Sequence, residues 1–160
     1  MRRLLADEAA TQRLGQALAA TRPAQAMMHL QGDLGAGKST LARALLRALG
    51  VAGTIRSPTY TLVERYPIDG GEAWHLDLYR IGDPGELDFL GLDDGAARLW
   101  LVEWPERGRG TLPPVDLTVA LAVDGNGREA VLQPASAAGT EWAARALESY
   151  DLAAIASDQH

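Results

Sequence analysis

Cysteine is absent from this chain of 160 residues, and histidine occurs only three times, at His29, His75 and His160. Without thiols the protein forms no disulfide and has no thiolate nucleophile. Three scattered histidines without cysteine do not make a structural zinc site. A chain that needs no oxidising compartment is expected in the cytoplasm.

Long hydrophobic runs are also missing. No stretch approaches the roughly 20 apolar residues that a helix needs to cross a bilayer, so we expect no membrane contact. The N-terminus has two arginines but turns acidic at Asp7 and Glu8, too early for a signal peptide. With 47% hydrophobic residues, residues 1–160 are expected to form one domain with its own core.

An excess of positive charge is lacking as well. The chain carries 21 acidic and 15 basic residues, which gives a formal net charge of −6. Proteins that bind nucleic acid over a broad surface usually present a basic patch. We therefore expect any link to RNA to run through a partner.

Lysine is almost absent, because Lys38 is the only one in the chain. It stands in Gly32–Ser39, GDLGAGKS, which matches the Walker A pattern G-x-x-x-x-G-K-[ST]. A compact ammonium fits between the β- and γ-phosphate oxygens of a nucleotide, whereas a planar guanidinium is wider. The motif predicts a phosphate-binding loop.

The flanking sequence gives this motif the context that it requires. Residues 26–31 form a short apolar run of strand length, and residues 39–49 repeat leucine and alanine at helical spacing. Gly50 follows where a helix C-terminal glycine is expected. A strand, a glycine loop and a helix in this order direct loop N–H groups and the positive helix end at an anion.

The rest of the sequence alternates helices and strands at first and has hairpins later. Beyond the strand and helix that flank the loop, the predicted helices cover 8–20 and 142–155, and a short helix starts at 83–87 with Asp83 as N-cap. The predicted strands lie within 57–66 and at 72–79, 99–102, 117–123 and 128–132, with turns at 69–71 and 124–127. We predict an α/β, P-loop NTPase-like three-layer fold. Its central sheet is expected to be mixed and mainly parallel, with antiparallel additions.

A carboxylate for magnesium is expected at the end of a second strand. Four apolar residues, 99–102, precede Glu103, so this acid should emerge at the carboxyl edge of the sheet, where ligands bind in open α/β folds. Ser39 supplies the loop hydroxyl that P-loop proteins use for the same ion. An acid that ends a buried strand can also be a simple surface cap.

A second acid, Asp77, shares one face of its predicted strand with His75 and Tyr79. This polar face could line the nucleotide site, or it could be the exposed face of a hairpin. His75 is interpreted as a hydrogen-bonded structural residue rather than a base. Arg80 could contact phosphate, a partner or a nearby acid, and the pattern does not separate these roles.

Three further segments lie where P-loop proteins keep accessory groups. Ser57-Pro58-Thr59 stands at the position of a γ-phosphate-sensing loop, or it is an ordinary turn. Trp104 either packs over the nucleotide site or fills the core. Arg107 and Arg109 either neutralise phosphates or are simply solvated, and the second interpretation is favoured.

Together these motifs resemble one family. The strings GDLGAGKST, SPTYTLVERY, HLDLYR, VEWPERG and GREA, with the turn at 83–87, occur in the order and spacing seen in the TsaE (YjeE) family. The resemblance covers residues from about 8 to 135. HLDLYR and VEWPE are far more specific than a phosphate loop alone.

The resemblance implies a P-loop ATPase of tRNA threonylcarbamoyladenosine synthesis that binds ATP and Mg²⁺ and hydrolyses ATP slowly. In the family this ATPase acts with TsaB and TsaD, which modify the adenosine beside the anticodon, while TsaC makes the threonylcarbamoyl-adenylate donor. The family ATPase is not the transferase. Its nucleotide cycle resets the TsaB–TsaD complex between turnovers, and it reaches tRNA only through these partners.

The resemblance also implies roles for individual residues at the matching positions. Lys38 would bridge the β- and γ-phosphates, Ser39 and Glu103 would hold magnesium, and Asp77 would act at the metal or at the attacking water. Trp104 would lie beside the site and support hydrolysis. The phosphate cradle would consist of Asp33, Leu34, Gly35, Ala36, Gly37, Lys38, Ser39 and Thr40.

Residues 57–59 would form the switch loop, and Thr11 and Arg128 would approach the nucleoside end. Two features depart from the family pattern. Ser39 stands where the family usually has threonine, although both supply the hydroxyl. A helical tail at 140–160 runs past the usual end of the family, and its role is undefined.

A phosphate-binding loop also suits three other functions. A GTPase would need an Asn-Lys-x-Asp motif, which is impossible because Lys38 and Asn126 are the only lysine and asparagine. A small-molecule kinase would use the same P-loop and place Arg107 and Arg109 in a lid. A non-enzymatic assembly factor would need ATP only as a structural ligand.

Overall fold

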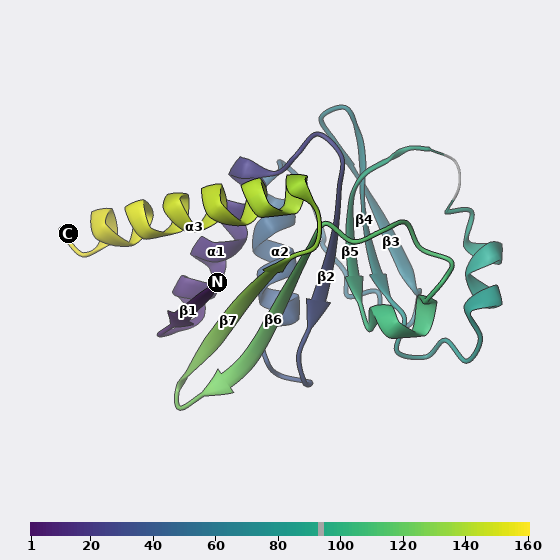
Figure 1. Ribbon diagram of the computed structural model, residues 1–160, viewed down its shortest axis with the longest axis horizontal. Coiled ribbons are helices and arrows are strands. Elements are labelled where there is room, and N and C mark those ends of the chain that lie inside the picture. Colours follow the sequence, from purple (N-terminus) through teal and green to yellow (C-terminus); the bar gives the residue numbers. More distant parts are fainter. Residues whose placement is uncertain (93–94) are drawn as a thin grey trace.

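A computed structural model describes residues 1–92 and 95–160 of the protein. These residues form a sheet with three α-helices on one face (Figure 1). Its elements follow the chain in this order: β1 (Arg2–Leu5), α1 (Glu8–Thr21), β2 (Ala26–Gln31), α2 (Lys38–Ala48), β3 (Val63–Ile68), β4 (Gly71–Asp77), the 3₁₀ helix η1 (Pro84–Leu90), β5 (Ala97–Glu103), the 3₁₀ helix η2 (Pro105–Gly108), β6 (Leu117–Asp124), β7 (Gly127–Pro134) and α3 (Ala137–Ser157).

The sheet has a parallel centre and antiparallel edges. Within the described residues it contains seven strands in the order β1-β7-β6-β2-β5-β4-β3. Strands β6, β2, β5 and β4 pair in parallel, whereas β1–β7, β7–β6 and β4–β3 pair antiparallel. The predicted mixed α/β sheet is thus confirmed. Both antiparallel hairpins turn at the predicted glycine-containing segments.

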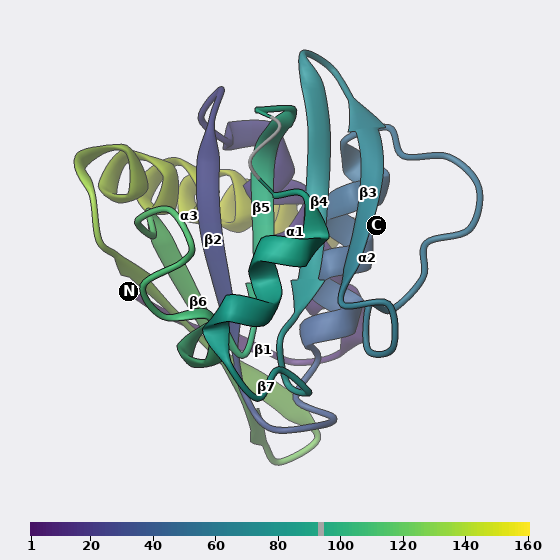
Figure 2. The same cartoon turned by 90° about the vertical axis from the view of Figure 1, so that its right-hand side faces the viewer.

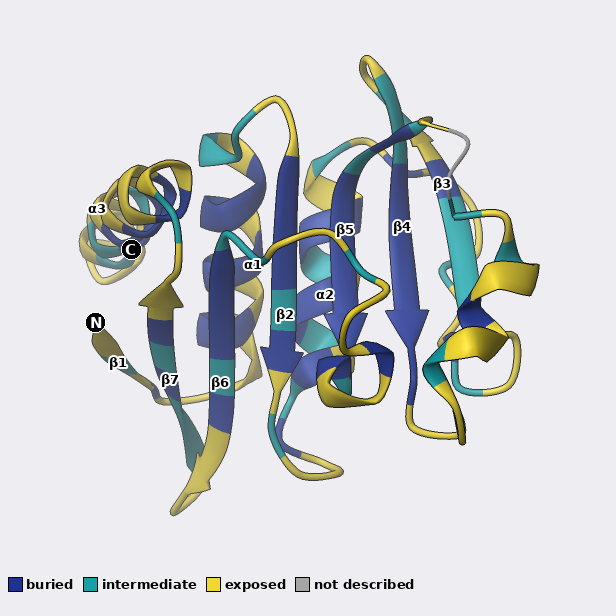
Figure 3. Cartoon of the chain, turned by 45° about the vertical axis from the view of Figure 1, so that its right-hand side comes forward, coloured by how far each residue is buried: buried dark blue, intermediate teal, exposed yellow. Residues whose placement is uncertain are grey.

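The two faces of the sheet are covered differently. Helices α1, α2 and α3 pack on one face over a core that includes Leu14, Leu45 and Trp142. The other face is covered by η1, η2 and their loops over a smaller core that includes Trp74 and Trp100 (Figure 2). Figure 3 shows the central strands almost wholly buried between these layers. Trp74 and Trp100 meet edge to face, 4.8 Å between ring centroids.

Helix α1 packs closely against α2 because of a glycine at the crossing. A Cβ at Gly15 would stand 2.8 Å from the Leu41 carbonyl oxygen of α2. Asp7 caps α1 by accepting a hydrogen bond from the Ala10 N–H, 2.8 Å. The close crossing of the two helices places the N-terminal turn of α1 beside the start of α2, where the phosphate loop ends.

Three elements differ from the prediction. Strand β1 was not predicted, because four residues beginning with Arg2-Arg3 carry too little hydrophobic pattern to indicate a strand. The short 3₁₀ helix η2 was not predicted either. Helix α3 begins at Ala137 rather than 142, with Ser136 as N-cap. By contrast, the predicted short helix with Asp83 as N-cap is confirmed as η1, a 3₁₀ helix whose capping box includes Glu86.

The first strand and the last helix meet at one edge of the sheet. Arg3 of β1 donates two hydrogen bonds to the Asp151 carboxylate of α3, at 3.0 and 2.8 Å. This partner lowers the pKa of Asp151 below its usual value. In the part of the chain that the structure describes, no helix is both long and apolar enough to cross a membrane.

Gly139→Ala is expected to destabilise the fold by about 2–3 kcal/mol. Alanine would normally favour a helix by about 1 kcal/mol, but here its Cβ would overlap the Asp116 carbonyl oxygen. Asp116 cannot easily retreat, because its carboxylate accepts from Met27 N–H and Ser136 Oγ–H. Urea unfolding measures the loss.

Gly82→Ala is the matched control for this substitution. Its Cβ would meet only the flexible end of Glu86, at 3.4 Å, so we expect a change within about 0.5 kcal/mol. Equal unfolding midpoints for the two variants would contradict the packing described at Gly139.

Candidate functional site

The phosphate-loop motif forms the link between β2 and α2. Strand β2 ends at Gln31 and α2 begins at Lys38, so the loop lies at the carboxyl edge of the parallel strands. Gly37 is the N-cap of α2 with a φ of 106°, a backbone conformation that residues with a side chain rarely adopt. The Ala36 N–H donates to the Asp33 carbonyl, 3.1 Å, and closes the loop. The predicted strand–loop–helix arrangement is confirmed.

Lys38 is buried at the start of α2, with 6% of its surface exposed. Its Nζ donates to the Gly32 carbonyl oxygen at the beginning of the loop. The same ammonium lies 4.9 Å from the ring centroid of Trp104. Among the residues that the structure describes, no carboxylate pairs with this ammonium, and a buried lysine without such a partner is chemically suited to a bound anion.

A pocket of about 310 Å³ opens beside this lysine. It is lined by Gly32, Asp33, Lys38, Trp104, Pro105 and Glu106, among others. The loop and η2 therefore form its opposite walls. Pro105 and Glu106 were not assigned to the site from sequence, because nothing in their pattern indicates that η2 folds back toward the loop.

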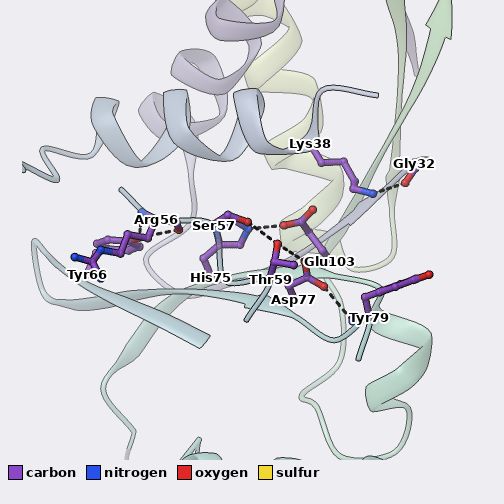
Figure 4. A network of polar contacts seen from close by, with 10 residues as sticks. All are labelled: Gly32, Lys38, Arg56, Ser57, Thr59, Tyr66, His75, Asp77, Tyr79 and Glu103. Atoms are coloured by element: carbon purple, nitrogen blue, oxygen red, sulfur yellow. Dashed lines mark hydrogen bonds and ion pairs between the residues drawn. The ribbon is translucent and has the colours of Figure 1, made fainter. Parts of the chain in front are cut away.

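The two predicted acids meet at the ends of adjacent strands. Asp77 is the last residue of β4 and Glu103 the last residue of β5, and they are register partners in the parallel pair. Both are buried. Figure 4 shows them with Lys38 on the same side of the sheet. The interpretation of Asp77 as an exposed hairpin residue is therefore wrong.

His75 contacts Glu103 directly. Its Nε2 lies 2.8 Å from Glu103 Oε2, and both side chains are almost fully buried (Figure 4). The prediction of a hydrogen-bonded structural histidine agrees with this geometry. The partner itself could not be foreseen, because it depends on how β4 and β5 pair.

The segment 57–59 lies against Asp77. Ser57 Oγ and Thr59 Oγ1 are 2.7 Å apart, and Thr59 Oγ1 donates to Asp77 Oδ2 over a long 3.5 Å. Asp77 Oδ1 also accepts from the Tyr79 N–H, 3.0 Å. The structure thus brings the predicted switch segment to one of the acids.

Trp104 lines the pocket beside Lys38 and also packs against the edge of the second core, so both predicted placements apply in part. Its backbone is left-handed, with a φ of 55°, which is unusual for a bulky residue and costs of order 1–3 kcal/mol. The ring also packs on Tyr79, with 4.9 Å between centroids. This conformation turns the indole toward Lys38.

The arginines of the region have different surroundings. Arg80 lies 4.4 Å above the exposed ring of Tyr60, and Arg107 donates to the Ile81 carbonyl and lies over Tyr79. Arg109 is exposed and lines a second, smaller cavity next to η2. Stacking and backbone contacts explain Arg80 and Arg107 without a phosphate.

Arg128 reaches the phosphate loop from β7. Its guanidinium donates to the carbonyl oxygens of Gly35 and Ala36, both at 3.1 Å. These bonds hold the loop from its outer side. Thr11 is buried on α1 near Gly37. A contact of either residue with a nucleoside remains a prediction.

His29 on β2 lines a second cavity next to the pocket. Burial lowers the pKa of His29, and the nearby Glu106 only partly opposes this effect. His29, Gln31 and Glu106 line this smaller cavity of about 240 Å³ beneath η2. The imidazole therefore adds no positive charge near the loop at neutral pH.

The predicted magnesium ligands are chemically suited to that ion. Ser39, Asp77 and Glu103 offer only oxygen atoms, and Mg²⁺ in nucleotide sites is typically held by one or two carboxylates together with phosphate oxygens and water. Among residues 1–92 and 95–160, no three His, Asp or Glu side chains are grouped as a complete metal site. A divalent ion here would need further oxygens from its ligand.

The loop, the strand order and the acids at the strand ends define an α/β protein of the P-loop class. Its fold is similar to the crystal structure of Bacillus subtilis YdiB, with a TM-score of 0.76 and 23% identity, over 92% of this chain and 94% of that one. A family model described as "Threonylcarbamoyl adenosine biosynthesis protein TsaE" matches residues 5–130. The chain belongs to the TsaE family.

Curated relatives support this assignment. The chain is 50% identical to the Haemophilus influenzae protein named "tRNA threonylcarbamoyladenosine biosynthesis protein TsaE" over 95 residues, which span 58% of this chain and 60% of that relative. A protein of the same name from Aquifex aeolicus is 36% identical over 122 residues, 75% of this chain and 85% of that relative. Members of the family are thus named for tRNA threonylcarbamoyladenosine biosynthesis.

Proposed function

We propose that this protein binds ATP with Mg²⁺ at the phosphate loop and hydrolyses it slowly to ADP and phosphate. The observation that carries this proposal is the burial of Lys38 inside the loop, beside a pocket and on the same side of the sheet as two strand-end carboxylates (Figure 4). A buried cation and acids at one edge of a parallel sheet suit a metal-bound triphosphate. No other lysine exists in the chain to serve this purpose.

In this proposal the loop N–H groups bind the nucleotide, and Lys38 both binds it and contributes to catalysis. The N–H groups from Asp33 to Thr40 bind the phosphates, and Lys38 stabilises the negative charge that develops on the γ-phosphate. Trp104 shields the ammonium from water, which strengthens its attraction for phosphate. Because the charge on the transferred phosphate changes during the reaction, the contact with Lys38 is expected to be stronger in the transition state than in the bound substrate.

The acids would serve the metal ion that accompanies the nucleotide. Ser39, Glu103 and Asp77 would hold Mg²⁺, which supplies charge neutralisation at the β- and γ-phosphate oxygens. Glu103 also orients the attacking water. Thr59 and Ser57 lie close enough to Asp77 to respond to the γ-phosphate.

The biological role proposed for this activity is in tRNA threonylcarbamoyladenosine modification in the cytoplasm. The protein acts with a TsaB–TsaD complex, and ATP hydrolysis resets that complex between turnovers. The net charge of −6 suits a subunit that meets tRNA only through its partners. The threonylcarbamoyl transfer itself belongs to the partners.

Reconstitution of tRNA modification tests this function. With TsaB, TsaC, TsaD, tRNA and the donor substrates, we expect multiple turnovers when this chain and ATP are present, and no more than about one turnover per complex without the chain. ADP and free phosphate should appear in equal amounts, and TsaB–TsaD should stimulate their release.

Two outcomes contradict the proposal. Equal product with and without the chain would remove the reset role. ADP released without matching free phosphate would indicate transfer to an acceptor, which is the small-molecule kinase alternative.

A further inference from the structure

His75 is a buried polar side chain that the proposed reaction does not yet use. It lies on β4, two residues before Asp77, and only 3% of its surface is exposed. Burying an imidazole costs free energy unless its nitrogens are hydrogen-bonded. Only one of them is bonded, because Nδ1 is buried without a hydrogen-bond partner among the described residues.

The one hydrogen bond that the His75 side chain makes among the described residues is to Glu103, the acid at the centre of the proposed site. A carboxylate can only accept hydrogen bonds, so the imidazole Nε2–H donates to Glu103 Oε2 across 2.8 Å. The two residues are not direct register partners, since His75 faces Leu101 and Glu103 faces Asp77. The bond is a diagonal between neighbouring strands and depends on their parallel register.

This bond restricts a side chain that would otherwise have several rotamers. A free glutamate loses up to about 2 kcal/mol of side-chain entropy when it is fixed in one conformation. The imidazole fixes it before any ligand arrives and occupies Oε2. In Figure 4 the other carboxylate oxygen of Glu103 is turned away from His75, on the side where α2 and Lys38 lie.

We propose that His75 is a positioning residue that holds Glu103 through Oε2 and leaves Oε1 to face the divalent ion and the attacking water. This inference rests on the proposed function, because it assigns His75 a task only if Glu103 serves a metal-bound nucleotide. Partners that orient a metal ligand typically change metal affinity or activity by roughly 10- to 100-fold when they are removed.

Three substitutions of His75 separate positioning from packing. Leucine removes the donor and keeps a bulky side chain. Glutamine carries an amide N–H at a reach close to that of Nε2, whereas asparagine is one carbon shorter and falls short of Glu103. If His75→Leu fails to fold, the glutamine and asparagine variants form a complete comparison.

The direct readout is binding of Mn²⁺, as a probe for Mg²⁺, to the protein saturated with a non-hydrolysable ATP analogue, followed by electron paramagnetic resonance. We expect His75→Leu and His75→Asn to weaken Mn²⁺ binding at least roughly 10-fold and to lower kcat similarly. His75→Gln should restore both to within about 3-fold. ADP affinity measured in EDTA should change less than about 2-fold in all three.

Unchanged Mn²⁺ affinity in the leucine or asparagine variant overturns the inference. So does a glutamine variant as impaired as the asparagine variant, or a parallel loss of metal-free ADP affinity, which would indicate general disruption of the loop. A wild-type protein that binds no ATP analogue would instead refute the proposed function.

Discussion

Lys38→Ala is expected to lower ATP hydrolysis by roughly 100- to 1,000-fold, the range found when one preorganised electrostatic group is removed from an active site. The reason is that Lys38 is the only lysine, is buried in the loop, and faces the pocket directly. Affinity for ATP should fall as well, since the ammonium also contacts the bound phosphates. A phosphate-release assay and an equilibrium titration with ATP measure the two effects.

Two variants show whether position and shape matter in addition to charge. Lys38→Arg keeps the charge but presents a wider, planar group, so we expect it to recover little activity. Arg43→Ala removes a positive charge from an exposed position on the same helix and should leave hydrolysis within about 2-fold. Similar losses in Lys38→Ala and Arg43→Ala would show that only overall charge matters and would contradict the assigned role of Lys38.

Glu103→Gln is expected to have the second largest effect, with a different profile. Glutamine keeps the shape of the side chain and can still accept from His75 through its amide oxygen. It loses the negative charge that serves the metal and the water. We therefore expect kcat to fall by roughly 100-fold or more, while affinity for ADP without metal stays within a few-fold.

Glu106→Gln is the matched control for this variant. Glu106 lines the pocket beside Lys38 from η2, three residues after Glu103, but it does not end a central strand and has no role in the proposed chemistry. Its replacement should change kcat by less than about 3-fold. If Glu106→Gln were as damaging as Glu103→Gln, the assignment of the catalytic acid to the end of β5 would be wrong.

The central part of the fold was predictable because it is encoded locally. The apolar run 26–31, the glycine loop and the helical spacing after Lys38 lie next to one another in sequence, so their patterns identify β2, the loop and α2 directly. The acid after an apolar run identified the end of β5 in the same way. The place of Asp77 at the same edge was expected only from the family resemblance, because its strand pattern alone left an exposed hairpin face open.

What could not be predicted depends on contacts between distant residues. The bond of Arg128 to Gly35 and Ala36 joins segments more than 90 positions apart. The His75–Glu103 bond requires the actual register of β4 and β5. Strand β1 is stabilised by pairing with β7, which four mostly polar or exposed residues do not reveal in advance.

The type of helix at η1 and η2 was also beyond the sequence pattern. Proline at the first turn and a capping aspartate indicate that a helix starts at Pro84, but they are equally compatible with an α-helix or a 3₁₀ helix. In the structure η1 is a 3₁₀ helix that buries Leu87 in the second core and leaves Phe89 exposed. The position of Trp104 depends on the same layer.

Calorimetric titration of the purified protein with ATP, in the presence and absence of Mg²⁺, tests the central claim most directly. That claim is that the loop around Lys38 and the acids of β4 and β5 form one site for a metal-bound triphosphate. The expected result is saturable binding of one ATP per chain, strengthened by Mg²⁺ and lost in Lys38→Ala. Absence of binding at millimolar ATP, or equal binding to wild type and Lys38→Ala, would contradict it.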